Sequence, residues 1–213
     1  MPGRVEYGAR VEATAKRMGS GIDQIPKEGA PAAPVPTARL FFALWPDDLA
    51  RAELARAIHE VARSCGGRPV PEHNLHATLV FLGSVAVNRL PELRTIGTQV
   101  ASSNAGAPLR LDFDRVEHWQ KPGVLVASAT AAAGVAAASA LARALLEATH
   151  RVGFDPDSKP FRPHVTIARK VGKQIRVPEM PALSLAFDSF ALVESRTGPE
   201  GPVYTVMEAF PLS

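Results

Sequence analysis

The sequence of 213 residues contains a single cysteine, Cys65, and this scarcity limits what the protein can be. One thiol excludes an internal disulfide bond and any zinc site built from several cysteines. Long apolar runs are also missing, because no stretch approaches the roughly 18 unbroken apolar residues of a transmembrane helix. The first residues carry Glu6 and Glu12 and lack the apolar segment of a secretory signal. We therefore expect a cytoplasmic protein that does not associate with a membrane.

What the sequence does contain is typical of a globular protein. Apolar residues make up 46% and charged residues 21% of the chain, a composition that can build a well-buried core. The formal net charge of +3 makes the protein mildly basic. A basic protein suits a polyanionic ligand without requiring one, so charge by itself identifies no partner.

Composition divides the chain into two regions. Residues 1–38 have few large apolar side chains and end in a segment rich in proline and alanine. Such a segment cannot bury enough surface to offset the entropy lost on ordering, so we predict a flexible N-terminal tail. We expect the folded domain to span residues 39–213, with two similar lobes that share a core.

A short pattern, His-x-Thr-apolar, occurs twice in the predicted domain. It is found at His76-Ala77-Thr78-Leu79 and at His164-Val165-Thr166-Ile167, 88 residues apart (164 − 76). Each copy lies in an apolar, β-branched run that predicts a short strand. Alternate side chains of a strand lie on the same face, so the histidine and threonine of each copy share a face. We expect the opposite face to point into a core through Leu75, Ala77, Leu79 and Phe81 in the first copy, and through Val165 and Ile167 in the second.

The segments around the two motifs predict further strands and three helices. Strand pairs joined by short turns, in mixed order with helices, are typical of an α+β fold with largely antiparallel sheets. We predict a bilobal fold, in which two sheets and flanking helices surround a central cleft and each lobe contributes one His-x-Thr motif. We also expect Gly83 to end the first motif strand and Val152 to face the core. The expected strands are Arg39–Trp45, Asn74–Leu82, Leu109–Glu117, Gly123–Thr130, Pro163–Ala168, Leu183–Glu194 and Val203–Phe210, and the expected helices follow Pro46 and cover Leu90–Ala101 and Ala131–Val152.

Paired histidines and threonines on facing strands suit acid and base chemistry at a phosphate. Histidine has an unperturbed pKa near 6.5, so one imidazole can remove a proton while the other donates one. A threonine hydroxyl two residues along the same face can donate a hydrogen bond to an oxyanion. The reaction that fits is opening or transfer at a phosphodiester, in which water loses one proton and the leaving oxygen gains another.

Two other interpretations of these histidines are open. A half-buried histidine in a strand is often a structural hydrogen-bonding residue rather than a catalyst. A metal site is the second possibility, because His73 and His76 are spaced like metal ligands. Odd spacing in a strand sends these two side chains to opposite faces, however, and no nearby pair of carboxylates completes a site. We therefore expect no metal and no other cofactor.

The residues around both motifs resemble those of a known family. The segments Arg39–Leu44, Asn74–Gly83 and Phe161–Arg169 follow one another as they do in the two-histidine (2H) phosphoesterases. Within that superfamily the chain most resembles the bacterial RNA 2',3'-cyclic phosphodiesterases, also called 2'-5' RNA ligases. The resemblance runs from Arg39 to about Phe210 and leaves the tail outside it.

The resemblance implies a reaction and a role for each motif residue. It implies an enzyme that uses no metal and opens a 2',3'-cyclic phosphate, at an RNA 3' end or on a nucleoside, to a 2'-phosphate. His164 would be the proton acceptor that activates water, and His76 would be the proton donor to the departing 3' oxygen. Thr78 and Thr166 would hold the phosphoryl oxygens as charge develops.

Three further residues are candidates for binding the substrate. The family's second motif is followed by a basic residue that matches Arg169, which would clamp a phosphate or a ribose. Strict alternation places Arg169 on the face opposite His164, so it reaches the cleft only if the strand bulges, ends or twists there. Phe41 and Phe42 could stack on a base, although aromatic residues in strands are more often part of a core.

Two other functions are compatible with the same cleft. One is the ligation or cleavage of 2'-5' linkages, which is the reverse or a relative of the same chemistry. The other is a binding module that holds RNA or a nucleotide without turnover, which would not need both an acid and a base. In each case we expect the protein to be a monomer.

Overall fold

The computed structural model describes residues 35–157, 159–172, 175–177, 179–199 and 201–212. Most of the predicted tail, residues 1–34, lies outside these ranges. The first strand, β1 (Thr37–Leu44), begins two residues before the predicted start of the domain at Arg39. The remaining elements are α1 (Asp48–Ser64), β2 (Arg68–Pro69), β3 (Ala77–Ala86), α2 (Leu90–Ser103), β4 (Leu109–Trp119), β5 (Val124–Ala129), α3 (Ala132–Arg151), β6 (His164–Arg169), β7 (Leu183–Phe187), β8 (Ser189–Gly198) and β9 (Gly201–Pro211), with 3-10 turns at Glu72–Asn74 and Val87–Arg89.

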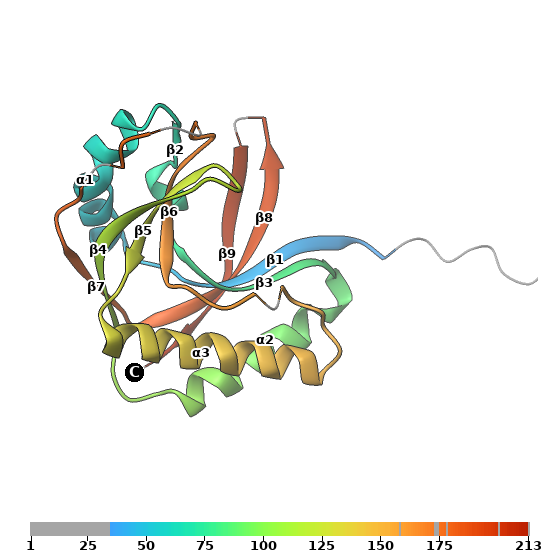
Figure 1. Cartoon of the computed structure of the whole chain (residues 1–213). Helices are drawn as coiled ribbons and strands as arrows, with labels where there is room; N and C mark the ends of the chain where they lie inside the picture. Colours follow the sequence, from blue (N-terminus) through green and yellow to red (C-terminus); the bar gives the residue numbers. More distant parts are fainter. Residues whose placement is uncertain (1–34, 158, 173–174, 178, 200, 213) are drawn as a thin grey trace, which may run out of the picture. The chain divides into compact units, whose positions relative to one another are not determined.

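Two antiparallel sheets form the framework of the domain (Figure 1). The first has the strand order β3-β1-β8-β9, and the second has the order β2-β6-β5-β4-β7. The paired strands run antiparallel in both sheets. With three helices added, this arrangement confirms the predicted α+β class. The two motif strands, β3 and β6, belong to different sheets.

The segment Leu183–Glu194, predicted as one strand, is two strands in different sheets. β7 pairs with β4 in the second sheet, whereas β8 pairs with β1 in the first. The break falls at Asp188, whose carbonyl oxygen accepts a hydrogen bond from the backbone N–H of Leu212 (2.8 Å). Apolar residues recur on both sides of the break, so the composition of the segment gives no sign that the chain changes sheets.

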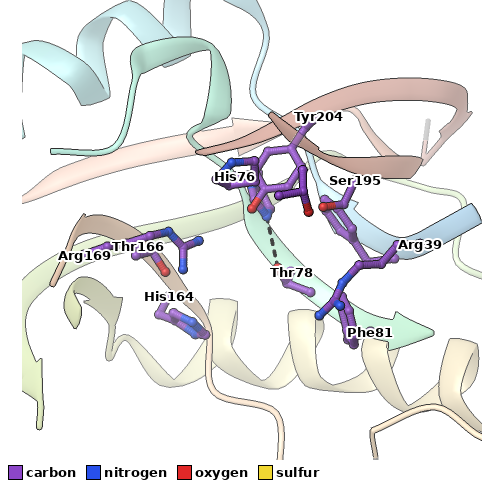
Figure 2. Close-up of a pocket in the computed structure, with 12 residues that line it drawn as sticks. Arg39, His76, Thr78, Phe81, His164, Thr166, Arg169, Ser195 and Tyr204 are labelled. Carbon is purple, nitrogen blue, oxygen red and sulfur yellow. Dashed lines mark hydrogen bonds between the residues drawn. The ribbon is translucent and has the colours of Figure 1, made fainter. Parts of the chain in front are cut away.

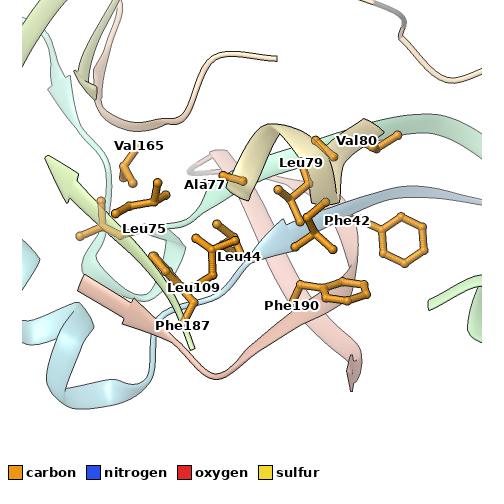
Figure 3. Packing of buried hydrophobic residues seen from close by; sticks show 14 of the residues in the cluster. Phe42, Leu44, Leu75, Ala77, Leu79, Val80, Leu109, Val165, Phe187 and Phe190 are labelled. Carbon is orange, nitrogen blue, oxygen red and sulfur yellow. The ribbon is translucent and has the colours of Figure 1, made fainter. Parts of the chain in front are cut away.

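The two sheets share one hydrophobic core (Figure 3). Phe42 of β1 and Phe190 of β8 enter it from the first sheet, and Leu109 of β4 and Val165 of β6 enter it from the second. β3 and β6 are in contact although they lie in different sheets. Because the apolar faces of both motif strands pack into the same close-packed core, their polar faces are held at a fixed relative position.

Helix α1 is the helix predicted to follow Pro46. Asp47 caps the helix by accepting a hydrogen bond from the backbone N–H of Ala50 (2.7 Å), which satisfies one of the free donors of the first turn. The helix contacts β2, β6 and β7, and therefore covers the second sheet. Its buried residues recur at helical spacing: Leu54, Ile58, Val61 and Ala62.

Helices α2 and α3 pack against each other and connect to both sheets (Figure 1). α2 contacts β8 and β9, and α3 contacts β3 and β4. The close approach of α2 depends on Gly97, because a β-carbon at this position would overlap the ring of Phe210. The prediction that Val152 faces the core is wrong. This residue follows the last turn of α3 as its C-cap and is 44% exposed.

Helix α3 is long and apolar enough, by length and composition, to cross a membrane. Its 20 residues nevertheless include three charged side chains at exposed positions, Arg143, Glu147 and Arg151. The opposite side of the helix, with Leu141 and Leu145, is buried in the core of the domain. This packing is that of a core helix in a globular domain.

Candidate active site

Both motif strands carry a β-bulge at the same position of the motif. The pairing of β3 with β1 skips Leu79, and the pairing of β6 with β5 skips Ile167. Each skipped residue directly follows the motif threonine. Because a bulge adds one residue, it reverses the alternation of the strand beyond that point. The sixth residue counted from the histidine therefore joins the histidine and threonine on the polar face, which is Phe81 in β3 and Arg169 in β6.

These bulges explain two positions that strict alternation does not. Arg169 lines the same pocket as the histidine and threonine of β6, because the strand bulges before it. Two predictions for β3 are wrong, and the bulge explains the first of them. Phe81, expected in the core, lines the pocket, and Gly83 does not end the strand. Instead, β3 continues to Ala86, with Gly83 at a φ of +72° that glycine adopts easily.

A pocket of about 480 Å³ lies between the polar faces of the two motif strands (Figure 2). The histidine, the threonine and the sixth residue of both motifs line it. No aspartate or glutamate is among the described residues that form its wall, so the pocket wall carries histidines and arginines but no carboxylate. Strands β1, β8 and β9 complete the wall with Arg39, Phe41, Ser195, Thr197, Pro202 and Tyr204.

Hydrogen bonds fix both the orientation and the tautomer of His76. Its Nδ1–H donates to the carbonyl oxygen of Asn74 (2.8 Å), and the hydroxyl of Thr78 donates to its Nε2 (3.1 Å). A carbonyl oxygen can only accept, so Nδ1 must carry the proton. In the neutral ring, Nε2 is therefore the basic nitrogen. It lies beside the Thr78 hydroxyl, on the pocket side of β3 (Figure 2).

Three aromatic rings surround the imidazole of His76. The ring centroids of Phe41 and Tyr204 each lie 5.0 Å from the imidazole centroid, and Trp45 stacks on it at 5.3 Å. The rings restrict the imidazole to one plane and keep water away from it. An enclosure of this kind disfavours the charged form of the ring.

Burial lowers the pKa of His76 from its ordinary value of 6.5 to about 4. The hydrogen bond to the Asn74 carbonyl opposes this change, because it favours a protonated ring. The positive charges of Arg169 and His164 lower the pKa further, in smaller measure. In the pocket without a ligand, His76 is therefore neutral at pH 7.

Contacts with Arg162 and Trp119 position His164. Its Nδ1–H donates to the carbonyl oxygen of Arg162 (2.6 Å), which leaves Nε2 for a ligand. The ring of Trp119 lies 4.4 Å from the imidazole. One carboxylate oxygen of Glu117 accepts hydrogen bonds from the Trp119 indole N–H (2.8 Å) and the Arg162 guanidinium (2.7 Å). Glu117 therefore connects the two groups that position His164.

Neighbouring charges of both signs act on the pKa of His164. Burial lowers the pKa of His164, against the effect of the Arg162 carbonyl. The Arg162 charge lowers the pKa as well, whereas the Glu117 charge raises it. The indole N–H of Trp119 holds the pKa of Glu117 below its usual range, so this carboxylate is ionised at neutral pH. His164 is thus a neutral imidazole at pH 7, with a negative charge nearby that stabilises its protonated form.

The structure brings six of the seven predicted site residues into one pocket, and Phe42 is the exception. Phe42 and Phe41 are neighbours in β1, so their side chains point to opposite faces of the sheet. Phe42 is fully buried and packs against Phe190 and Phe210 in the core. The prediction that Phe42 binds substrate is therefore wrong. The residues that do line the pocket are Phe41, His76, Thr78, His164, Thr166 and Arg169.

The sequence patterns did not indicate a row of polar side chains across the first sheet. Arg39 of β1 is the direct partner of Ser195 of β8, which in turn is the partner of Tyr204 of β9. All three line the pocket, and the Arg39 guanidinium lies 4.8 Å from the centre of the Phe81 ring. Arg39 shares a strand face with Phe41, which alternation could have indicated. Ser195 and Tyr204 could be found only once the strand order was known.

The described residues contain no group of three or more His, Cys, Asp or Glu side chains that could hold a metal ion. His73, which is spaced from His76 like a metal ligand, lies exposed in a 3-10 turn before β3. His76 instead faces the aromatic rings of the pocket. The imidazoles of His73 and His76 are therefore in different environments.

One histidine strand from each of two antiparallel sheets lines the pocket, which is the arrangement predicted for a two-histidine phosphoesterase. Residues 46–198 match the family model of the 2'-5' RNA ligase superfamily. An RNA 2',3'-cyclic phosphodiesterase of Thermus thermophilus is 36% identical over 183 residues, which cover 82% of this chain and 90% of that protein. The protein therefore belongs to the 2'-5' RNA ligase superfamily of two-histidine phosphoesterases.

Solved structures resemble this one over nearly their whole length. The crystal structure of a Thermus thermophilus protein is 34% identical, covers 82% of this chain and 97% of its own, and gives a TM-score of 0.69. Escherichia coli LigT in complex with 3'-AMP is 26% identical, covers 84% of this chain and 99% of its own, and gives a TM-score of 0.71. The predicted fold and family are thus confirmed.

Proposed function

We propose that this protein is an RNA 2',3'-cyclic phosphodiesterase that hydrolyses the terminal cyclic phosphate of RNA to a 2'-phosphate without a metal ion. The observation that carries the proposal is the pair of histidines in one pocket. In each of them Nδ1 is held by a backbone carbonyl, so Nε2 is the nitrogen that can exchange a proton with a ligand. Two such nitrogens on opposite strands can serve as base and acid in a single displacement.

In the proposed reaction His164 acts as the proton acceptor. Its Nε2 takes a proton from water while the water oxygen forms a bond to phosphorus. The bond from phosphorus to O3' breaks, and its electron pair stays on O3'. His76 is the proton donor, and its Nε2–H protonates O3'. The products are a 2'-phosphate and a free 3'-hydroxyl, and proton exchange with solvent then restores both imidazoles.

Three other side chains of the motif face stabilise the charge that develops on the phosphoryl oxygens. The hydroxyl of Thr166 donates a hydrogen bond to these oxygens, and so does the hydroxyl of Thr78 once Nε2 of His76 is protonated and no longer accepts from it. The guanidinium of Arg169 adds a charged donor. Donors that are already oriented need no rearrangement when the charge develops, and each is typically worth a few kcal/mol of transition-state stabilisation. Phe41 is 2% exposed and its ring centroid lies 5.0 Å from that of His76, so it also holds the acid in place.

The low pKa of His76 is consistent with its role as the acid. An imidazolium with a pKa of about 4 gives up its proton readily, but few molecules carry that proton at pH 7. The negative charge of a bound cyclic phosphate favours the protonated form. Substrate binding therefore charges the acid at the moment it is required, and departure of the product favours its return to the neutral state.

The relatives support the same substrate class. The Thermus thermophilus relative is named as an RNA 2',3'-cyclic phosphodiesterase, and the similar LigT structure holds a nucleotide, 3'-AMP. We infer that RNA 3' ends or nucleoside 2',3'-cyclic phosphates are the ligands of this pocket. We further propose that the protein works as a monomer in the cytoplasm. Ligation is not favoured, because the curated relatives carry the name of the hydrolase.

The proposal is tested by hydrolysis of adenosine 2',3'-cyclic phosphate in the presence of EDTA. His76→Ala and His164→Ala are each expected to lower kcat by about 10²-fold or more, the range typical of acid and base residues. His59→Ala is the matched control, because His59 is exposed on α1. Full activity in both pocket variants, or loss of wild-type activity with EDTA, would contradict the proposed mechanism.

A second assay separates hydrolysis from the two alternative functions. RNA halves that end in a 2',3'-cyclic phosphate and a 5'-hydroxyl are incubated with the protein, and the products are resolved on a gel. We expect the opened 2'-phosphate end. Joined RNA would identify a ligase, and a stable complex without any product would identify a binding module.

A further inference from the structure

A second pocket, of about 270 Å³, adjoins the first where β2, β6 and the β8–β9 hairpin meet. It shares Arg169, Pro202 and Tyr204 with the first pocket. A ligand that leaves the first pocket past these residues therefore enters the second. Arg68 and Lys170 add two further positive charges to its wall. The rest of the wall is largely apolar and rich in proline.

The positively charged side chains of this second pocket lie next to one another, and this arrangement lowers the stability of the protein. Arg68 of β2 and Arg169 of β6 are direct partners in the antiparallel ladder, where like charges destabilise a sheet. Lys170 follows with a φ of 57°, a left-handed conformation that is uncommon for a residue with a β-carbon. Within the described ranges none of the three side chains forms an ion pair, and no acidic residue lines the pocket. An anion bound between them would remove the repulsion.

The backbone holds Arg68 in this arrangement. A β-carbon at Gly67 would lie 2.8 Å from the carbonyl oxygen of Arg169, so only glycine allows β2 to approach the end of β6 this closely. On its other side, Arg68 reaches the β8–β9 hairpin. Its guanidinium lies 3.8 Å from the point where a β-carbon on Gly201 would lie. Arg68 therefore bridges the space between β6 and the hairpin.

Asn74 connects the second pocket to the first. Its side-chain amide donates a hydrogen bond to the carbonyl oxygen of Pro202 (2.9 Å) in the wall that both pockets share. Its backbone carbonyl oxygen accepts a hydrogen bond from the Nδ1–H of His76. The same buried residue thus orients the acid of the first pocket and fixes one side of the second.

We propose that the second pocket is a subsite for the phosphodiester that joins the terminal nucleotide of the RNA to its 5' neighbour. The inference rests on the proposed function, because O2' and O3' of the terminal ribose are both tied up in the cyclic phosphate. The strand can continue only through O5', so the next phosphate lies on the 5' side. Guanidinium groups bind phosphate oxygens in pairs, and the proline-rich wall accommodates the neighbouring sugar or base. The substrate class is thus RNA of two or more nucleotides.

Three substrates test this subsite. The first is adenosine 2',3'-cyclic phosphate, and the second is the dinucleotide of two adenosines that ends in the same cyclic phosphate. The third is that dinucleotide with an uncharged methylphosphonate in place of the linking phosphodiester. For the wild-type protein we expect kcat/KM to be at least about tenfold higher for the charged dinucleotide than for the mononucleotide. The methylphosphonate should lose most of this advantage, because it keeps the second nucleoside and lacks only the charge.

Variants identify the residues that provide the preference. Arg68→Ala and Lys170→Ala should each lower the ratio of kcat/KM for dinucleotide over mononucleotide by several-fold to about tenfold. Arg56→Ala removes the same charge from an exposed position on α1, outside both pockets, and should leave the ratio unchanged. Circular dichroism melting curves confirm that each variant is folded.

Each outcome has a separate meaning. Equal kcat/KM for all three substrates overturns the subsite but not the hydrolase. A preference for the dinucleotide that survives in the methylphosphonate also overturns it, because contacts to the nucleoside would then be responsible. Hydrolysis of none of them overturns the proposed function. In that case binding tests the subsite instead. Calorimetry measures the affinities of the wild-type protein and the same variants for a dinucleotide and a mononucleotide that both end in a 2'-phosphate. The ratio of these two affinities then takes the place of the ratio of kcat/KM values.

Discussion

The environment of His76 determines both its chemistry and its effect on stability. Three aromatic rings enclose the imidazole and lower its pKa to about 4. In the unfolded chain the same imidazole would titrate near its ordinary value of 6.5. Between these two pH values the unfolded state binds more protons than the folded state, so the free energy of unfolding rises with pH.

We therefore predict that the protein loses stability as the pH falls from about 6.5 to 4, by an amount on the order of 3 kcal/mol from His76 alone. Urea denaturation at a series of pH values measures this loss. His76→Gln has no titratable group at this position, so its stability should fall less steeply in the same window. Identical slopes for the two proteins would show that the pKa of His76 is not lowered in the folded state.

Glu117 acts on His164 through its neighbours rather than by direct contact. Its carboxylate binds Trp119 and Arg162, and its charge raises the pKa of His164. Glu117→Gln keeps the shape and removes the charge. We predict that the acidic limb of the pH profile of kcat/KM moves to lower pH, and that kcat/KM at pH 7 falls by up to about tenfold, because the base is less firmly positioned.

The control for this prediction is Glu60→Gln, which removes a carboxylate from an exposed position on α1. Both profiles are measured with adenosine 2',3'-cyclic phosphate. A reduced rate with an unshifted acidic limb would mean that Glu117 supports only the fold of β4. An acidic limb that moves to higher pH would contradict the stated direction of its effect on His164.

At the level of strands and helices, the sequence predicted the apolar patterns well, but it did not predict the bulges or the order of the strands in each sheet. The buried stripe of α1 and the alternation at His76 and His164 follow from local spacing, so they were accessible from the sequence. The bulges at Leu79 and Ile167 were not, because a bulge depends on the partner strand as much as on the strand that carries it. The break at Asp188 was missed for the same reason.

The packing of α2 on β9 gives a prediction at this level. Gly97→Ala raises the helix propensity of α2 by about 1 kcal/mol, but its β-carbon would overlap the ring of Phe210. We expect a net loss of about 1 to 3 kcal/mol in the free energy of unfolding, as is usual when a packed core is overfilled. Thr98→Ala, at an exposed position of the same helix, should change stability by much less. A more stable Gly97→Ala protein would mean that α2 can move away from β9.

For the molecule as a whole, one hydrophobic core supports both halves of the site. Side chains from both sheets pack in it, including the apolar faces of β3 and β6. The predicted bilobal fold was right in giving one motif to each sheet. What the sequence could not supply was which strands close the pocket. Arg39 and Tyr204 line the same pocket because β8 pairs with both β1 and β9 in the first sheet.

The described core and pocket are built from Ala38 and later residues. We predict that a chain starting at Val35 folds and hydrolyses adenosine 2',3'-cyclic phosphate with kcat/KM within about twofold of the full-length value, because the groups proposed to carry out the reaction are all retained. Parallel assays and melting curves of the two chains test this. A large loss of activity at an unchanged melting temperature would assign residues 1–34 a part in binding the substrate.

The shared bulge has a consequence for how such proteins diversify. The first and third positions of the motif are the same in both strands, whereas the sixth is Phe81 in one and Arg169 in the other. Proton transfer and ligand recognition are thereby encoded at different positions of one short segment. A single codon change at the sixth position can alter which ligand is accepted while the reacting groups are inherited unchanged.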